Sequence, residues 1–567
     1  MPDSEPSPSV IHTGDTVDSI RMVLSYHQQT KHHLDRYARS LGYLDWATQP
    51  NPFRTFKGTR RIDLPLAADG LNALFADLFT PSAIPAQPLN LKSVAILFEL
   101  ALGLSAWKEF EGNRWALRCN PSSGNLHPTE GYAVLPALPD LEPGVYHYVS
   151  RDHCLERRCF LEDGAAADLA RALAPESFLV GLSSIHWREA WKYGERAFRY
   201  CQHDVGHAIA AVRYAAAALG WSAFLLDWLS DDDVAAVLGL NRGADFAGVD
   251  PHDREHPDAL ILVSREPAIA LPRTLPVEAI RGGHWWGQAN QLSPSYVVWT
   301  VIDEVETATW KPATDWSGRV DPAPLPPLTS GCRSSAATLI RQRRSCQSLD
   351  GQSVIAADTF YRMLDHLLPR PGVLPWDALP WPPQLNAGIF VHRVTGLAPG
   401  LYLLERDPAI HDRLRGALKQ SFLWERPANC PEHLPLYFLM PGDLQRTGQM
   451  VSCNQDIAAD GAFSLGMIAD FSPTIRANGA WWYRRLFWEA GVLGQVLYLE
   501  AEAAGVRSTG IGCYFDDTFH ELLGLTGDAF QDLYHFTVGG PIEDHRLTTL
   551  PPYAHLDRGQ EAKKSSP

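Results

Sequence analysis

An internal repeat constrains the fold of this chain more than any other feature of its 567 residues. Several glycine positions of one half recur in the other half at one constant offset in residue number. The matched positions are Gly206 and Gly491, Gly220 and Gly505, and Leu238-Gly239-Leu240 and Leu523-Gly524-Leu525. Both segments between the first two glycines are rich in Ala, with apolar residues at helical spacing. Each closes on a Gly that suits a helix C-terminus, so the repeat predicts two copies of one unit.

A second matched pair lies earlier in each half and indicates strands. Pro143-Gly144-Val145-Tyr146 and Pro399-Gly400-Leu401-Tyr402 stand at a somewhat smaller offset, each between hairpin-like, β-rich runs. We therefore expect an α+β fold with two lobes, each an antiparallel-type sheet covered by helices. A duplicated unit on one chain often mimics a two-fold dimer, and sites at its interface then take walls from both lobes.

The expected boundaries follow from composition. Residues 15–300 form the N-terminal lobe, 301–335 a Pro-rich linker and 336–555 the C-terminal lobe. The sequence KPATDWSGRVDPAPLPPLTSGCRSS within the linker is rich in Pro, Ser and Gly, which favours an extended connection.

Charge and cysteine usage exclude several classes of function. The formal net charge is -16, and a chain this acidic is a poor candidate for binding nucleic acid or an anionic membrane surface. The 9 cysteines include no Cys-x-x-Cys pair, which favours reduced thiols in the cytoplasm over disulfides, zinc or iron–sulfur clusters. The N-terminus shows no secretory signal, and no apolar stretch is long enough to span a bilayer convincingly.

Three short segments carry candidate chemistry. The run Arg341 to Gln347 places clustered guanidiniums beside a hydroxyl, a good binder of phosphate, although a solvated basic face is an alternative. The run Asn120 to Glu130 is a small, polar, Gly- and Pro-containing loop that can lie against a planar heterocycle, or be an ordinary turn. The run Ser508 to Asp517 contains a Gly-x-Gly through which backbone can approach a ligand closely, although bulges and turns share it.

Together these segments resemble the nitroreductase-like flavoproteins, and in particular their SagB/ThcOx branch, which includes the azoline oxidases of peptide maturation. The resemblance covers most of the chain. Its motifs are Arg-Arg-Ser, the Pro-Ser-Ser-Gly-Asn loop, Trp191-Lys192-Tyr193-Gly194 and the Gly-Ile-Gly-Cys-Tyr-Phe-Asp-Asp run.

The resemblance implies that FMN is the cofactor and that both lobes bind it. The Arg-Arg-Ser segment, the Gly-Ile-Gly turn and a C-terminal Arg would come from the second lobe, and the Pro-Ser-Ser loop from the first. The implied cofactor residues are Arg343, Arg344, Ser345, Gln347, Ile511, Gly512, Arg546, Pro121, Ser122, Ser123 and Asn125. The family often has Lys or Arg at the position of Gln347. The mirror-related site lacks these motifs, so we expect one flavin per chain.

For catalysis, the resemblance points to Lys192 and Tyr193, which stand where azoline oxidases have a Lys-Tyr pair. A Lys acts as a base only if burial or nearby positive charge lowers its pKa, and Arg188, Arg196 and Arg199 are close in sequence. The alternative is an exposed Lys on an amphipathic helix.

Two further groups are open to simpler interpretations. His203 and His207 stand one helical turn apart, but a metal site would need a third ligand, so packing is favoured and no metal is predicted. Cys453 is interpreted as buried packing rather than as a nucleophile.

The leading hypothesis is an FMN-dependent oxidoreductase that transfers hydride between the flavin and a small or peptide-derived substrate, with azoline dehydrogenation as one form. One alternative is a nitro or quinone reductase fed by NAD(P)H. Another is a flavin-free scaffold in a complex with peptide-modifying partner proteins.

Overall fold

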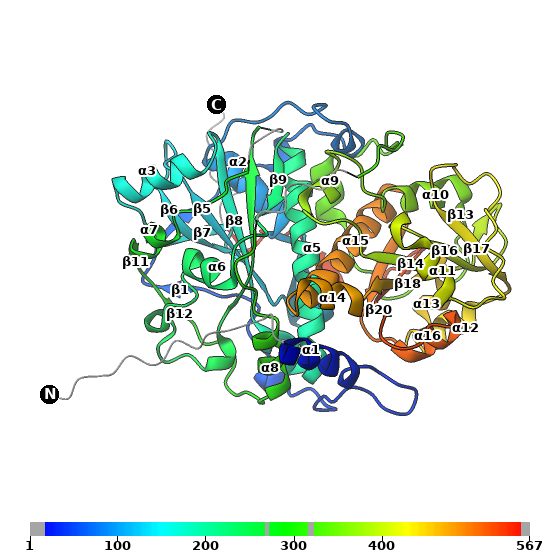
Figure 1. Ribbon diagram of the computed structural model, residues 1–567. Helices are drawn as coiled ribbons and strands as arrows, with labels where there is room; N and C mark the ends of the chain where they lie inside the picture. Colours follow the sequence, from blue (N-terminus) through cyan, green and yellow to red (C-terminus); the bar gives the residue numbers. More distant parts are fainter. Residues whose placement is uncertain (1–16, 267–270, 316–321, 557–567) are drawn as a thin grey trace.

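Two antiparallel sheets lie on either side of a pair of long helices in the computed structural model, which describes residues 17–266, 271–315 and 322–556 (Figure 1). The first sheet has the strand order β11-β7-β6-β5-β8-β10-β9, with β2 also paired to β7. The second has the order β17-β16-β14-β18-β20-β19. From β7 to β9 and from β17 to β19 the two sheets run through their strands in the same order. The predicted α+β class with antiparallel sheets is therefore confirmed.

The strands of the first sheet are β2 (Arg60–Asp63), β5 (Thr129–Leu135), β6 (Gly144–Val149), β7 (Cys154–Phe160), β8 (Ser177–Ser184), β9 (Ser222–Leu225), β10 (His256–Ser264) and β11 (His284–Trp285). Those of the second are β14 (Leu385–Val391), β16 (Gly400–Leu404), β17 (Leu436–Pro441), β18 (Phe463–Asp470), β19 (Arg507–Ile511) and β20 (Phe530–Gly539). Short pairs are formed by β1 (Phe56–Lys57) with β12 (Gln288–Ala289) and by β13 (Ile355–Ala356) with β15 (Val394–Thr395).

The α-helices are α1 (Val17–Gln29), α2 (Leu91–Ala101), α3 (Asp163–Ala172), α4 (His186–Tyr193), α5 (Ala197–Ala218), α6 (Asp231–Leu238), α7 (Val277–Arg281), α8 (Thr300–Ala308), α9 (Ala336–Gln342), α10 (Ala357–Asp365), α11 (His411–Ala417), α12 (Gln445–Val451), α13 (Ile457–Asp460), α14 (Ser472–Asn478), α15 (Trp482–Ala503) and α16 (Asp516–Leu523). The bounds of α5 and α15 differ by the same offset as the repeated glycines, as do those of α6 and α16.

Helices α5 and α15 cross between the sheets with their backbones in near contact (Figure 1). A Cβ atom placed on Gly206 would lie 2.1 Å from the carbonyl oxygen of Trp488, and one on Gly491 would lie 2.2 Å from that of His203. These contacts are reciprocal, because Trp488 is the counterpart of His203 in the repeat. Glycine is required at both positions since only hydrogen fits between the helices.

Two buried ion pairs across the interface are also reciprocal. Arg199 on α5 pairs with Asp516 on α16 at 2.9 Å, and Arg484 on α15 pairs with Asp231 on α6 at 2.6 Å. Each pair joins one half of the chain to the other, and the repeat relates each residue of one pair to a residue of the other. Such an exchange of equivalent contacts is the arrangement of a two-fold interface.

The first and the last described segments of the chain extend this interface, since each lies against the opposite half. The His27 ring on α1 lies 4.4 Å from the ring of Phe471 in the second half. At the other end, β21 (Thr548–Leu550) pairs with β3 (Leu104–Phe110), which also pairs with β4 (Asn113–Arg118). The C-terminal arm thereby crosses onto the first half.

The predicted linker 301–335 begins too early. Its first residues belong to α8, which buries Val301, Ile302, Val305 and Ala308. Their spacing is that of an amphipathic helix, so apolar burial overrides the loop expected there. Residues 322–334 carry no helix or strand, and residues 316–321 of the linker lie outside the described residues.

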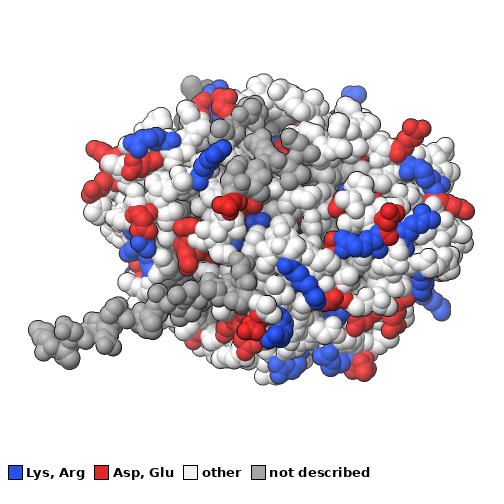
Figure 2. Space-filling view, viewed as in Figure 1, with Lys and Arg blue, Asp and Glu red and all other residues white. Residues whose placement is uncertain are grey.

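On the face shown in Figure 2, acidic and basic side chains are interspersed rather than gathered by sign. Among the described helices, none combines the length and the apolar character that crossing a membrane requires.

The helix crossing generates a stability prediction. Gly206→Ala forces a methyl group against a backbone oxygen that no rotamer change can move, so it should lower the free energy of unfolding by about 3 kcal/mol. The matched control is Gly416→Ala in α11, where an added Cβ meets nothing within 4 Å; its stability should change by less than about 1 kcal/mol. Urea denaturation measures both, and equal effects would contradict the close crossing.

Candidate functional site

A cavity of about 1000 Å³ lies between the two halves, with walls from both. The first half contributes β3, β4, the loop at 120–127 and one side of α5, and the second contributes residues 343–348, β19 and the segment 542–547. All the residues predicted to bind the cofactor line it: Arg343, Arg344, Ser345, Gln347, Ile511, Gly512, Arg546, Pro121, Ser122, Ser123 and Asn125. The fold therefore brings these distant segments together.

Hydrogen bonds from α5 and from within the loop fix the conformation of the Pro-Ser-Ser loop. Asp204 on α5 accepts from the backbone amide of Ser123 at 3.1 Å and from its hydroxyl at 3.0 Å. The Ser122 hydroxyl accepts from the amide of His127 at 2.7 Å, and Asn125 donates to the Ala116 carbonyl at 2.9 Å. Because Asp204 is 1% exposed, the loop rests on a buried carboxyl group.

The Arg-Arg-Ser segment follows α9 and joins the two halves. Arg343 donates to the carbonyl of Arg118 at 2.9 Å, and its guanidinium lies 4.9 Å from the centre of the Tyr498 ring. Arg344 donates to the Ser105 carbonyl at 3.0 Å. Ser345 shares a hydrogen bond of 2.8 Å with the Tyr498 hydroxyl. The contacts of Arg343 are thus largely structural, whereas Ser345 is exposed to the cavity.

The end of β19 forms the opposite wall through closely packed glycines. A Cβ on Gly512 would lie 2.3 Å from the ring of Tyr200, whose hydroxyl donates to the Gly512 carbonyl at 3.0 Å. A Cβ on Gly510 would lie 1.9 Å from the Tyr534 hydroxyl. Tyr200 and Tyr534 pack against the end of β19 and hold it in place. The backbone of this strand end therefore borders the cavity.

Cations crowd one part of the cavity. Burial and the neighbouring charge of Arg343 lower the pKa of Arg344 to about 10. Burial and Arg344 likewise lower the pKa of Lys108, which lies on β3 and was not predicted from the sequence. Arg507 on β19 contributes to both shifts. Like charges held this close favour an anion, because an anion would relieve their repulsion.

Two residues predicted to bind the cofactor lie at the edge of the cavity. Gln347 is exposed. Arg546 is also exposed, and its guanidinium donates to Asp544 at 2.9 and 2.7 Å. The charge of Arg546 is therefore already opposed by a carboxylate in its own loop.

Lys192 and Tyr193 are the last two residues of α4. Tyr193 lines the cavity, while the half-buried Lys192 is outside its lining residues. A Cβ on Gly124 of the Pro-Ser-Ser loop would lie 2.6 Å from the Tyr193 hydroxyl and 3.1 Å from the Lys192 Nζ. Both side chains thus meet that loop beside the cavity.

The expected cationic neighbours of Lys192 are engaged elsewhere. Arg188 pairs with Glu130, and Arg196 and Arg199 pair with Asp516. The group that interacts with Lys192 is Glu189, which is fully buried. Burial and the carboxyl group of Asp204 raise the pKa of Glu189 well above its usual range. Lys192 therefore lies near a buried carboxyl group rather than near a group of arginines.

His203 and His207 are packed and hydrogen-bonded. His203 bonds the carbonyl of Leu533 at 3.0 Å and stacks on Tyr534 at 4.1 Å. His207 bonds Gln495 at 3.2 Å and the Tyr534 hydroxyl at 3.3 Å. Each ring thus has a structural partner.

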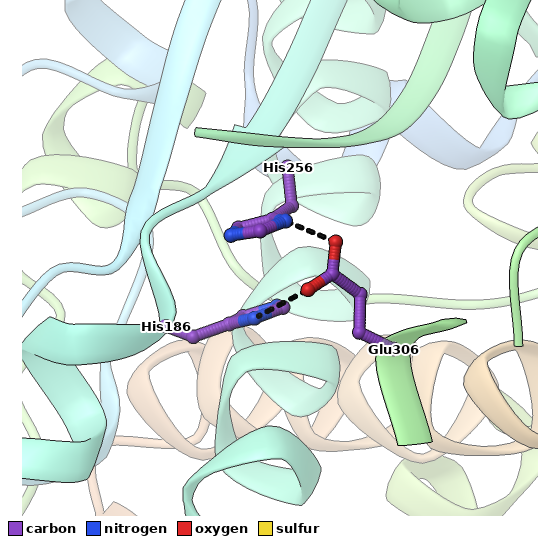
Figure 3. Close-up of side chains that lie close together, drawn as sticks. All are labelled: His186, His256 and Glu306. Atoms are coloured by element: carbon purple, nitrogen blue, oxygen red, sulfur yellow. Dashed lines mark hydrogen bonds and ion pairs between the residues drawn. The ribbon is translucent and has the colours of Figure 1, made fainter. Parts of the chain in front are cut away.

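A different group of potential metal ligands lies away from the cavity lining, at His186, His256 and Glu306 (Figure 3). Their ligand atoms all lie within 4.8 Å of one another. However, the two rings are stacked with centres 4.3 Å apart and planes at 5°. An imidazole nitrogen binds a metal in the plane of its ring, and one ion cannot lie in both planes. The geometry fits an ion pair of His256 with Glu306, which ties α8 to the first half.

Sequence reasoning missed several lining residues, notably Lys108, Trp115, Tyr200, Asp204, Tyr498, Tyr534 and Arg507. Most are single residues on strands or helices, with no local motif. The Ala-rich repeat holds a usable signal, since Asp204 is the only acidic residue of α5.

Comparison with known proteins gives consistent results. Residues 340–540 match the Nitroreductase family. A Methanocaldococcus jannaschii protein named as a nitroreductase is 25% identical over 162 residues, which cover 28% of this chain and 77% of the relative.

The similarity to a solved structure reaches beyond residues 340–540. A crystal structure from Anabaena variabilis ATCC 29413, also named as a nitroreductase, aligns with a TM-score of 0.64 at 22% identity and covers 92% of this chain and 99% of its own. An FMN complex from Exiguobacterium sibiricum 255-15 covers 38% of this chain and 92% of its own, with a TM-score of 0.23 and 12% identity. The chain thus shares the fold of the Anabaena structure, and residues 340–540 of its second half are similar to the Nitroreductase family.

Proposed function

We propose that this chain is an FMN-dependent oxidoreductase that holds one FMN in the cavity between its halves and transfers hydride between the flavin and a small or peptide-derived substrate. The observation that carries the proposal is the convergence of all the predicted cofactor residues, from distant segments, on one cavity. Its volume of about 1000 Å³ is at the upper end of ligand pockets, so a cofactor would leave room for substrate.

The residues present suit a flavin nucleotide. Of the crowded cations, Lys108 and Arg344 would take the phosphate, since charge-assisted hydrogen bonds to phosphate are strong. Arg507 already pairs with Glu502 and Glu543. The Nε of Arg343 is buried and has no hydrogen-bond partner among the described residues. The Pro-Ser-Ser loop and the backbone at Ile511 and Gly512 would border the ring system. When bound, FMN would supply hydride acceptance and donation, and the protein would supply position and electrostatics.

One flavin per chain is supported by the region that the repeat relates to the cavity. Leu225 occupies the position equivalent to Gly510, and the cavity it lines has a volume of only about 60 Å³. Arg485, equivalent to Tyr200, donates to the Asp227 carbonyl at 3.1 Å and lies 4.2 Å from the Trp481 ring. Bulky side chains thus fill the second site.

For substrate dehydrogenation, Lys192 and Tyr193 are the proposed catalytic residues. Burial and the carboxyl group of Glu189 raise the pKa of Tyr193 well above its usual range, so its phenol keeps its proton and can donate a hydrogen bond. Lys192 would accept the proton that leaves the substrate as hydride passes to the cofactor.

The phosphate assignment predicts how FMN affinity depends on charge. Lys108→Ala should raise the dissociation constant of FMN roughly 10- to 100-fold, as expected for the loss of one charge-assisted bond of about 1.5–3 kcal/mol. Arg546→Ala is the control, because Asp544 already holds that guanidinium, and its effect should stay below about threefold. Fluorescence titration of FMN into each protein measures the constants. Unchanged binding in Lys108→Ala would refute the assignment.

The catalytic assignment predicts a separation of binding from chemistry. Lys192→Ala should retain FMN, because Lys192 is outside the lining residues, but should lose flavin reduction by an azoline-containing peptide under anaerobic conditions. Loss should reach about 100-fold or more, the usual contribution of a general base. Flavin absorbance follows the reaction. If NADPH bleaches the wild-type flavin rapidly and the azoline peptide does not, the nitro or quinone reductase alternative replaces this function.

Asp204 predicts a pH dependence of stability. Burial raises its pKa to about 7, against the hydrogen bonds from Ser122 and Ser123, so the folded chain binds this proton more tightly than the unfolded chain. The stabilisation is present at low pH and is lost as the pH rises from about 4 through about 7. Relative to Asp204→Asn, the wild type should therefore lose stability over this range and level off above it. Thermal melts of both proteins across pH test this, and a constant difference would contradict it.

A further inference from the structure

Two cysteines meet at the wall of the cavity, although they stand far apart in the sequence. Cys453 lies in the turn between α12 and α13, and Cys513 follows β19 directly after Gly512. The two side chains interact with each other. Cys513 lines the cavity. The expectation that Cys453 is buried packing is wrong, because both residues are half-exposed, free cysteines.

The backbone around the thiols is fixed on both sides. The side-chain amide of Gln455 donates to the carbonyl of Ser452 at 2.9 Å and to that of Cys513 at 2.9 Å. The amide of Phe515 donates to the Val451 carbonyl at 2.8 Å. Cys453 itself has a φ of 53°, a left-handed conformation that is uncommon for a residue other than Gly, Asn or Asp. These bonds hold the two cysteine-bearing segments close together.

The two thiols differ in acidity. The interaction with Cys453 lowers the pKa of Cys513, and the Arg196 guanidinium acts in the same direction against burial. The same interaction raises the pKa of Cys453. An acidic thiol supported by a second thiol and a cation is the arrangement of reactive cysteine pairs.

We propose that Cys453 and Cys513 form a redox-active pair that interconverts between two thiols and one disulfide by exchange with a small-molecule disulfide. The disulfide would pin the turn after α12 to the segment that carries Ile511 and Gly512. Any effect on FMN retention rests on the proposed function, whereas the exchange itself does not.

The exchange balances with oxidised glutathione as the oxidant. The Cys513 thiolate attacks one sulfur, the S–S bond of glutathione breaks, and the first glutathione leaves and takes a proton from water. Cys453 then loses its proton to solvent and attacks the Cys513 sulfur, which releases the second glutathione. Two protein thiols are oxidised by two electrons, and one small disulfide is reduced to two thiols.

The test uses the full-length protein, first reduced and then exposed to oxidised glutathione. Remaining thiols are alkylated, and a digest made without reductant is read by mass spectrometry. The wild type should yield a linked peptide containing residues 453 and 513, with or without FMN bound. Both cysteines found alkylated, or each found separately glutathionylated, would overturn the proposal.

Variants assign the two roles. Cys453→Ser should accumulate a glutathione adduct on Cys513, because no second thiol can resolve it. Cys513 should also be alkylated faster than Cys453 in the reduced wild type, since the thiolate is the nucleophile. Cys430→Ser is the control, as Cys430 is also half-exposed but its sulfur lies 3.7 Å from an Arg426 nitrogen and from the Leu434 carbonyl oxygen. It should form the linked peptide normally. Equal alkylation rates would contradict the assigned roles.

FMN content of the same samples separates this proposal from the proposed function. A linked peptide in a chain that never binds FMN would leave the redox pair standing and refute the flavin assignment. FMN binding without a linked peptide would do the reverse.

Discussion

The contact of α5 with α15 at Gly206 and Gly491 is the constraint on which the rest of the structure depends. Because the helix backbones touch there, the two sheets are brought close enough for side chains to cross between halves. The reciprocal ion pairs Arg199–Asp516 and Arg484–Asp231 form around that crossing. Wider helix separation would also open the cavity, since α5 carries Asp204 beneath the Pro-Ser-Ser loop.

A single chain with two related halves can give their equivalent positions different side chains. A two-fold dimer of identical subunits cannot, because each substitution would appear in both sites. Here Gly510 lines a cavity of about 1000 Å³, whereas its counterpart Leu225 lines a cavity of about 60 Å³ in a filled region, where Arg485 lies against Trp381. The open region of the interface can thus hold a ligand, while the filled region can stabilise the contact between the two halves. The buried arginine and tryptophans of the filled region supply the packing that an open site lacks.

Much of the fold and of the site could be predicted because the relevant signals are local. Gly206 and Gly491 are visible as a repeat, and the Arg-Arg-Ser and Pro-Ser-Ser segments are contiguous motifs. Lys108 and Asp204 are single charges on a strand and a helix, and only the fold brings them to the cavity. The contact of Cys453 with Cys513 likewise depends on the packing of two turns. The start of the linker was predicted wrongly for another reason. The apolar spacing of α8 is visible in the sequence, but the Pro-rich run that follows it favoured a loop.

The central claim is that the two halves together build one flavin site. The most direct measurement is a titration of the flavin-free chain with FMN, followed by flavin fluorescence, at protein concentrations well above the dissociation constant. The account predicts a break at about one FMN per chain, because the described residues of the related region line a cavity of only about 60 Å³, far below ligand size. A break at two would show that the filled region opens to bind a second flavin, and no binding at all would contradict the flavin site itself.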